Sequence, residues 1–209
     1  MTKKEYIIMA TTKEKILSQA ERLFNEEGYN NVSLRDIAEA AGTTIGNLTY
    51  HFPQKENLVF AIQSELYTEF LHNFVDQQDG LLTFENMINS FLRINENRKK
   101  NAFFYRNIVE LCQESSAIAS SVDTFRQKIY QYYLSSFLNL QQEEILRNDI
   151  STKQYETLAY TVVYLSGMWW QNTTQYYDES IPRIELHTAL KDLIYPYLTK
   201  KGMSIFSSF

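Results

Sequence analysis

The spacing of apolar residues along the first sixty positions predicts three short helices. A first apolar stripe begins after the N-cap residue Thr11, and Gly28 is a natural stop. A second stripe begins after the N-cap residue Ser33 and breaks at Gly42. A third ends before Pro53, because the residue before a proline resists the helical region. The apolar positions are Ile16, Ala20, Leu23 and Phe24, then Leu34, Ile37, Ala38 and Ala41, then Ile45, Leu48 and Phe52.

The second and third of these helices, joined by a tight turn, form a helix-turn-helix motif. Asp36 completes a capping-box-like pair with Ser33, and Thr43 or Thr44 can cap the helix after the turn. In such a motif the last helix can enter the major groove of DNA. The alternative, from spacing alone, is a plain helical hairpin inside a bundle. The outward positions of the last helix are Thr44, Gly46, Asn47, Thr49, Tyr50 and His51.

The stretch from Ala40 to Gln54 contains no charged side chain. A solvated helix normally carries Lys and Glu on its outer face. The uncharged face is therefore typical of a surface where an acidic side chain would be penalised.

Beyond residue 54, further stripes predict six more helices in a second, larger part. The first begins at Lys55 and is too long for the N-terminal unit alone, so we expect it to bridge both parts. Asp79-Gly80 marks a turn, and the polar stretch 97–101 indicates a solvated break. Residues 203–209 are expected to be poorly ordered unless Phe206 packs on the core. The predicted helical ranges are 55–76, 83–98, 102–113, 152–176 and 182–198, together with a long helix that follows the stretch 114–116, runs through Val122 and ends near Asn148.

The composition favours an all-α fold. The 209 residues are 44% hydrophobic and 14% aromatic, which is enough for a sizeable core, and include only six Gly and three Pro. The chain has no run of eighteen apolar residues, and we expect neither a signal peptide nor a membrane partner. The lone Cys112 excludes an internal disulfide and fits a reducing compartment. The expected location is therefore cytoplasmic.

The charge balance argues against a broad basic surface. The net charge is −5 and the pI is about 5.3, which is not typical of a nucleic-acid-binding protein. Residues 1–60 carry seven basic and eight acidic side chains. Any DNA affinity would therefore rest on a few placed contacts and on helix N-termini, with a modest salt dependence.

The sequence gives no positive support for an enzyme. The three histidines, His51, His72 and His187, lack ligand-like spacing, and Cys112 has no partner cysteine. No glycine-rich phosphate loop or nucleophile elbow is present. We therefore expect no metal site and no cofactor.

Aromatic residues are abundant: fifteen Tyr, thirteen Phe and two Trp, mostly beyond residue 60. Most of them are expected to fill a core. Some can instead line a cavity in which tyrosine hydroxyls orient a partly aromatic or amphipathic small-molecule effector. The predicted lining residues are Phe103, Phe104, Tyr105, Tyr132, Tyr133, Trp169 and Trp170.

A dense series of motif positions runs through residues 12–60: Ala20-x-x-Leu23-Phe24, Gly28-Tyr29, Val32-Ser33-Leu34, Ile37-Ala38, Ala41-Gly42, Gly46, Leu48, His51-Phe52 and Lys55-Glu56-x-Leu58. This series resembles the N-terminal domain of TetR/AcrR-type transcriptional regulators. One departure concerns the tyrosine that usually follows the leucine of the third helix and commonly touches a phosphate. Here Thr49 stands at that position, and the phosphate contact is expected to shift to Tyr50.

The resemblance implies a repressor that a small-molecule effector releases from a two-fold operator in double-stranded DNA. Its helix-turn-helix DNA-binding domain would span 1–55, and its domain for effector binding and dimerisation 56–209. We expect Thr44, Asn47 and Tyr50 to face base edges or the adjoining backbone. Lys55 should contact a phosphate. The predicted DNA-binding set is Ser33, Thr43, Thr44, Asn47, Thr49, Tyr50, His51 and Lys55.

The last two predicted helices carry more apolar residues than one inward stripe uses, which favours a homodimer. Ser166 and Gly167 would permit close helix approach at this interface. The residues concerned are Val162, Val163, Leu165, Met168, Trp169, Trp170, Leu186, Leu190, Leu193, Ile194, Tyr197 and Leu198.

Two other classes of protein stay open on the residues alone. A helical ligand- or lipid-binding module without DNA binding is favoured by the acidic pI. An enzyme built in a helical bundle has only the aromatic cavity in its favour.

Overall fold

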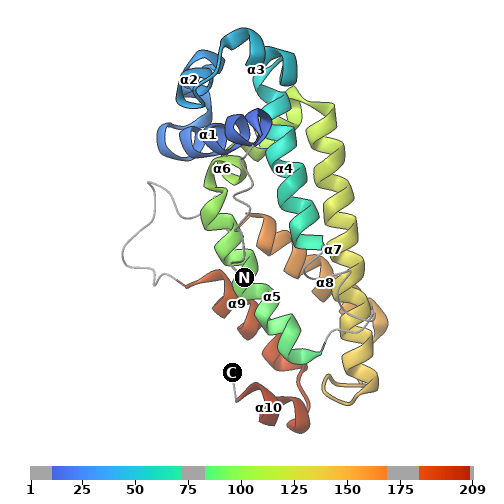
Figure 1. Cartoon of the computed structure of the whole chain (residues 1–209). Coiled ribbons are helices and arrows are strands. Elements are labelled where there is room, and N and C mark those ends of the chain that lie inside the picture. The colour runs from blue at the N-terminus through green and yellow to red at the C-terminus, as the bar shows by residue number, and fades with distance from the viewer. Residues whose placement is uncertain (1–10, 72–82, 169–183, 208–209) are drawn as a thin grey trace, which may run out of the picture. The chain divides into compact units, whose positions relative to one another are not determined.

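The described residues of this chain, 11–71, 83–168 and 184–207, form helices and no strand in the computed structural model (Figure 1). The all-α prediction is confirmed. The chain divides into two compact units, Met1–Glu65 and Leu66–Phe209. Helix α4 (Lys55–Leu71) begins in unit 1 and ends in unit 2. No helix in the described part of the chain is both long and apolar enough to cross a membrane.

Unit 1 is built from α1 (Thr12–Glu27), η1 (Tyr29–Asn31), α2 (Leu34–Ala40), α3 (Ile45–His51) and the start of α4. The predicted capping boxes begin α1 and α2, and Gly28 ends α1 with a φ of 89°. Most residues of the predicted stripes are buried, whereas Leu34 and Ala41 are half-buried. Ile45 is 41% exposed, because it is the first residue of a short helix whose Leu48 occupies the interior.

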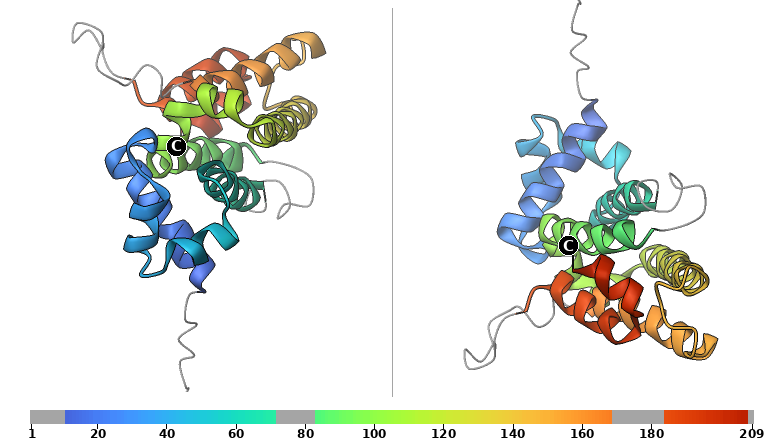
Figure 2. Two further views of the ribbon diagram at one scale, coloured as in Figure 1. Left: turned by 90° about the horizontal axis from the view of Figure 1, so that it is seen from above. Right: turned by 90° about the horizontal axis from the view of Figure 1, so that it is seen from below.

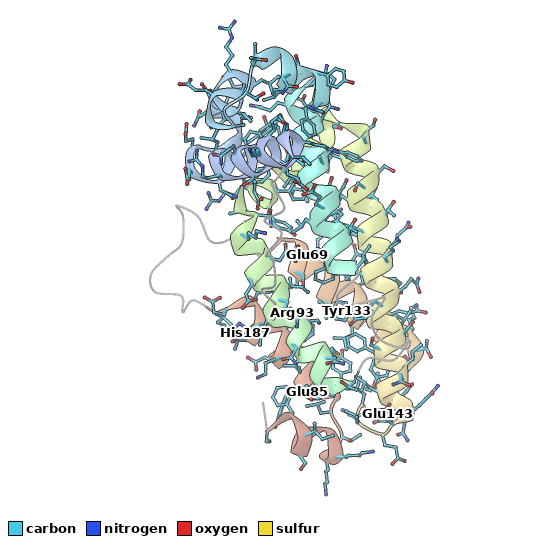
Figure 3. The ribbon with its side chains drawn as sticks, viewed as in Figure 1. Glu69, Glu85, Arg93, Tyr133, Glu143 and His187 are labelled. Atoms are coloured by element: carbon cyan, nitrogen blue, oxygen red, sulfur yellow. The ribbon has the colours of Figure 1, made fainter. Side chains whose placement is uncertain are left out.

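Unit 2 contains α5 (Phe84–Lys100), α6 (Ala102–Glu114), α7 (Ser116–Gln142), α8 (Thr152–Met168), α9 (Leu186–Ile194), η4 (Tyr195–Tyr197) and α10 (Lys200–Phe206). Helix α7 packs against α6 and α8, and α5 packs against α9 (Figure 2). The core joins α5, α7, α8 and α9 around Tyr133, whose hydroxyl lies 3.0 Å from the hydroxyl of Ser90 (Figure 3). This buried polar pair satisfies both groups inside an aromatic core.

Several predicted boundaries are wrong, and one of them is the start of the last predicted helix, which begins at Leu186 and not at residue 182. The polar stretch 97–101 continues α5 to Lys100, and the side chain of Asn101 is buried and donates a hydrogen bond to the carbonyl of Asn97. Helix α7 ends at Gln142, before the predicted 148. Residues 200–206 form α10, because the Thr199 hydroxyl caps the helix by accepting from the amide of Gly202. The predicted turn at 79–80 lies outside the described residues.

The apolar surplus of the last two helices is used within the chain. Val162 and the α9 stripe are buried in the core of unit 2 itself. The argument that these apolar side chains need a second chain to cover them is therefore wrong for the buried ones, because α5 and α7 of the same chain already cover those. The buried residues concerned are Val162, Leu186, Leu190, Ile194 and Leu198, whereas Val163, Leu165, Leu193 and Tyr197 are half-buried.

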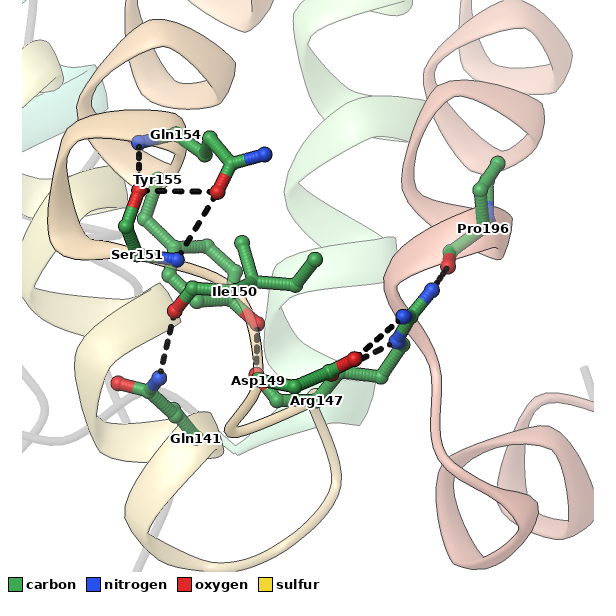
Figure 4. Close-up of polar contacts among 8 residues, drawn as sticks. All are labelled: Gln141, Arg147, Asp149, Ile150, Ser151, Gln154, Tyr155 and Pro196. Carbon is green, nitrogen blue, oxygen red and sulfur yellow. Dashed lines mark hydrogen bonds and ion pairs between the residues drawn. The ribbon is translucent and has the colours of Figure 1, made fainter.

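We call the pairing of residues 143–147 with residues 197–202 the C-terminal clasp. Its backbone bonds run from the Arg147 amide to the Tyr197 carbonyl (2.9 Å) and from the Thr199 amide to the Ile145 carbonyl (3.0 Å). Figure 4 shows the Arg147 guanidinium held between the carboxylate of Asp149 and the carbonyl of Pro196. The clasp fastens the end of the chain to the turn after α7.

Candidate DNA interface and effector cavity

The start of α2 is fixed by a hydrogen-bonded pair. The Ser33 hydroxyl and backbone amide both donate to the carboxylate of Asp36, at 2.6 and 2.8 Å, and the Asp36 amide donates back to the hydroxyl. These bonds, the side-chain bond first, hold the pKa of Asp36 below its ordinary value. Ser33 is exposed, but its hydroxyl is occupied by this cap.

The turn between α2 and α3 depends on Gly42, whose φ of 63° suits a residue without a side chain. Thr44 then caps α3, its hydroxyl accepting from the Asn47 amide at 3.2 Å. The hydroxyl of Thr43 accepts from the side-chain amide of Asn47 at 2.8 Å. The turn therefore both starts α3 and orients one of its outward side chains.

The outward face of α3 carries neutral hydrogen-bonding groups. Thr44, Asn47 and His51 are exposed, and Tyr50 is 83% exposed with its ring edge-on to the ring of His51. The hydroxyl of Thr49 instead donates to the Ile45 carbonyl at 3.0 Å, inside the helix. An uncharged row of amide, hydroxyl and ring groups on a short helix suits the base edges of a major groove.

Lys55 is bound within unit 1. Its ammonium donates to the carbonyls of Tyr29 (2.7 Å) and Val32 (3.0 Å) and lies 4.2 Å from the centre of the Tyr29 ring. These contacts join the first residue of α4 to the turn between α1 and α2. The predicted phosphate contact stays a prediction, and the geometry adds a second role for this lysine.

A cavity of about 60 Å³ lies in unit 2 between α4, α5, α6, α7 and α8. Of the predicted lining residues, Tyr105 and Tyr133 line it. Phe103 and Phe104 are buried core residues outside its lining, and the hydroxyl of the half-buried Tyr132 has no hydrogen-bond partner among the described residues. Trp169 and Trp170 lie outside the described residues. Sequence reasoning missed the α4 wall and the stacked pair of Tyr67 and Phe125, 3.8 Å apart.

Two family models match the chain. The model described as "Bacterial regulatory proteins, tetR family" matches residues 16–62, and the one described as "Bacterial transcriptional repressor" matches residues 66–206. The chain belongs to the TetR family. The two matches meet between residues 62 and 66, close to the division between the two units.

Named relatives of this TetR-family chain are regulators, not enzymes. The HTH-type transcriptional regulator UidR of Escherichia coli K12 is 24% identical over 73% of this chain and 78% of its own length. The probable HTH-type transcriptional regulator YttP of Bacillus subtilis is 37% identical, but only over 27% of this chain and 28% of its own. These matches identify this chain as a transcriptional regulator with a DNA-binding helix-turn-helix.

Solved structures repeat this TetR-family fold. A TetR-family transcriptional regulator from Marinobacter aquaeolei VT8 has a TM-score of 0.80 at 20% identity, over 95% of this chain and 98% of its own. At this identity the likeness concerns the fold alone.

Proposed function

We propose that this TetR-family regulator is a repressor that leaves a two-fold DNA operator when a small molecule occupies unit 2. One observation carries the proposal: α4 takes part in both sites. Its first residue, Lys55, is anchored to unit 1, and its last turns supply Leu66, Tyr67 and Phe70 to the cavity wall. A ligand that moves the end of α4 thereby acts on the helix that leaves the helix-turn-helix.

The DNA contacts are proposed from exposure and chemistry. Thr44, Asn47 and Tyr50 would face base edges, because they are exposed on one uncharged helix. His51 would lie beside the backbone. Thr43, Thr49 and Ser33 have hydroxyls that already bond within unit 1, so their support for DNA binding is mainly to hold α2 and α3 in place.

The proposal includes a homodimer, because a two-fold operator needs two recognition helices. They reach successive major grooves only when about 34–36 Å apart, or a multiple of that spacing. An effector that fits a different separation shifts the population away from the DNA-bound form. Sedimentation is expected to give twice the 24.6 kDa mass of the chain.

The test is selection of bound DNA from a random pool by the full chain. We expect a consensus with two-fold symmetry, and weaker binding of that consensus when an effector found by screening is added. If random and selected duplexes bind equally well, the proposal of sequence-specific regulation is wrong, and the alternative of a ligand-binding module is favoured. If the consensus binds but no small molecule weakens it, only effector release fails.

A further inference from the structure

A second hollow lies beside the 60 Å³ cavity. It is a groove of about 370 Å³ between α6, α7 and α8. Both hollows have Ile108, Arg126, Val163 and Gly167 in their walls. The cavity and the groove therefore adjoin along these four residues.

Gly167 leaves the shared wall open. A Cβ atom built at this position would meet no heavy atom within 4 Å among the described residues. No other helix of the described chain therefore approaches Gly167 closely, and the expected approach of a helix from a second chain stays a prediction. A glycine inside a helix lowers stability relative to alanine, and no packing contact offsets that loss here. What the missing side chain does provide is space where cavity and groove meet.

Among the described residues that line the cavity, one buried side-chain polar group has no hydrogen-bond partner. Ser166 is only 5% exposed, and its hydroxyl makes no hydrogen bond among the described residues. A buried hydroxyl in this state lowers stability unless something bonds to it. A bound molecule with a hydrogen-bonding atom at its inner end would satisfy it.

Arg126 is the only charged side chain in the described lining of either hollow. Among the described residues it forms an ion pair with Asp123 at 3.7 Å, in which both side chains are about half exposed or more. Asp123 lines neither hollow. Such a pair is weak and easily exchanged. The guanidinium can therefore bind an anionic group of a ligand.

The α8 side of the groove also carries two aromatic rings. The rings of Tyr160 and Tyr164 stack with their centres 5.5 Å apart, and both side chains are more than half exposed. They offer a ring or chain an apolar surface with hydroxyls at its edge. The volumes indicate which part of a ligand each hollow can hold. The volume of the groove is in the range of ligand pockets, whereas the cavity holds only a few atoms.

We propose that cavity and groove form one site for an amphipathic monoanion. Its apolar body lies in the groove against Tyr160 and Tyr164, its carboxylate or sulfonate pairs with Arg126, and a narrow end passes Gly167 toward Ser166. The proposal rests on the proposed function and names the chemical class of its effector.

A matched pair of dyes tests the charge. Anilinonaphthalene sulfonate and phenylnaphthylamine share one ring system, and only the first carries an anion. We expect the full chain to bind the anionic dye more tightly in fluorescence titrations. Arg126→Gln should raise the Kd of the anionic dye about tenfold and change that of the neutral dye less than about twofold. Arg106→Gln is the control, because Arg106 is an exposed arginine of α6 outside both linings. Equal losses in both variants would overturn the assignment of Arg126.

A second variant tests the position. Gly167→Val should weaken both dyes, because its side chain fills the space shared by the two hollows, and unchanged dye binding would overturn the proposal. Sedimentation of the same samples tests whether a second copy of the chain occupies the groove instead. Loss of a dimer in Gly167→Val or Tyr164→Ala would mean that it does.

The dye experiment and the DNA selection can fail separately, because dye binding needs no DNA. Failure to bind dye would not affect the selected operator consensus, and failure to obtain a consensus would not affect the dye result.

Discussion

The side-chain nitrogen of Asn47 lies 2.8 Å from the hydroxyl oxygen of Thr43, to which it donates a hydrogen bond. Asn47 is exposed on α3, and Thr43 is the residue before the helix cap. The bond fixes the rotamer of the amide, so that its oxygen and second N–H are preset before DNA arrives. An outward amide held in one orientation loses little entropy on binding.

We expect Asn47→Ala to relax base preference at one position of each half-site. A well-placed amide contributes about 1–3 kcal/mol of discrimination at a single base pair. Thr43→Val should have a smaller effect on the preference at the same base pair, because it only releases the Asn47 side-chain amide from its hydrogen bond. Repeating the DNA selection with each variant measures this, and an unchanged consensus in Asn47→Ala would remove Asn47 from the base-reading set.

Lys55→Met should destabilise unit 1. Its ammonium holds two carbonyls and an aromatic ring, and a hydrogen bond to a charged group contributes about 1.5–3 kcal/mol. Hydrogen exchange of the amides in α1 and α2 measures the loss, with Lys15→Met on the exposed face of α1 as the control. The salt dependence of DNA binding tests the phosphate contact separately. A slope reduced by about one, at unchanged stability, would mean that Lys55 serves the phosphate alone.

The cap of α2 should make unit 1 sensitive to acid. Because folding lowers the pKa of Asp36, its stabilising effect is complete above the unfolded value near 3.8 and is lost as the pH falls through the folded pKa. The stability difference between wild type and Asp36→Asn should therefore shrink from about pH 5 to about pH 2. Hydrogen exchange of α2 reports it, and Glu39→Gln, outside the capping box, should show no such trend.

Gly202→Ala should open the C-terminal clasp. A Cβ atom at this position would lie 2.3 Å from the carbonyl oxygen of Ile145, so the backbone must move, at a cost of about 1–3 kcal/mol. Urea unfolding of the full chain measures it. Gly167→Ala is the matched control: its Cβ meets nothing, and it should leave stability unchanged or raise it by up to about 1 kcal/mol.

The helix-turn-helix was predictable because its signals are local. Ser33, Gly42 and Pro53 each constrain the backbone through their own side chain or its absence, and the structure has helix boundaries where they predict them. The predicted burial of Ile45 was wrong, and Leu34 and Ala41 are only half-buried. The spacing of apolar residues does not show how far a small core extends along a short helix. The predicted roles of the outward residues in DNA binding are still predictions.

The cavity was not predictable residue by residue. Phe104 and Tyr105 are neighbours in one aromatic run, yet only Tyr105 lines the cavity, because lining depends on which helices meet there. Ser166 gave no signal, as a serine in a helix usually bonds to its own backbone. Gly202 gave no signal either, because its need for a glycine comes from a carbonyl more than fifty residues away in sequence.

The absence of charge from Ala40 to Gln54 also affects how long the protein stays on the wrong DNA. Dwell time on random sequence comes almost entirely from charged contacts with phosphates. If α3 reads the DNA as proposed, we expect this regulator, whose net charge is −5, to detach quickly from such sites and to sample many of them in a given time. Its residence time at the operator then depends on the fit between neutral groups. The ratio of the dwell time at the operator to that on random DNA, and not the length of either, decides which gene it occupies.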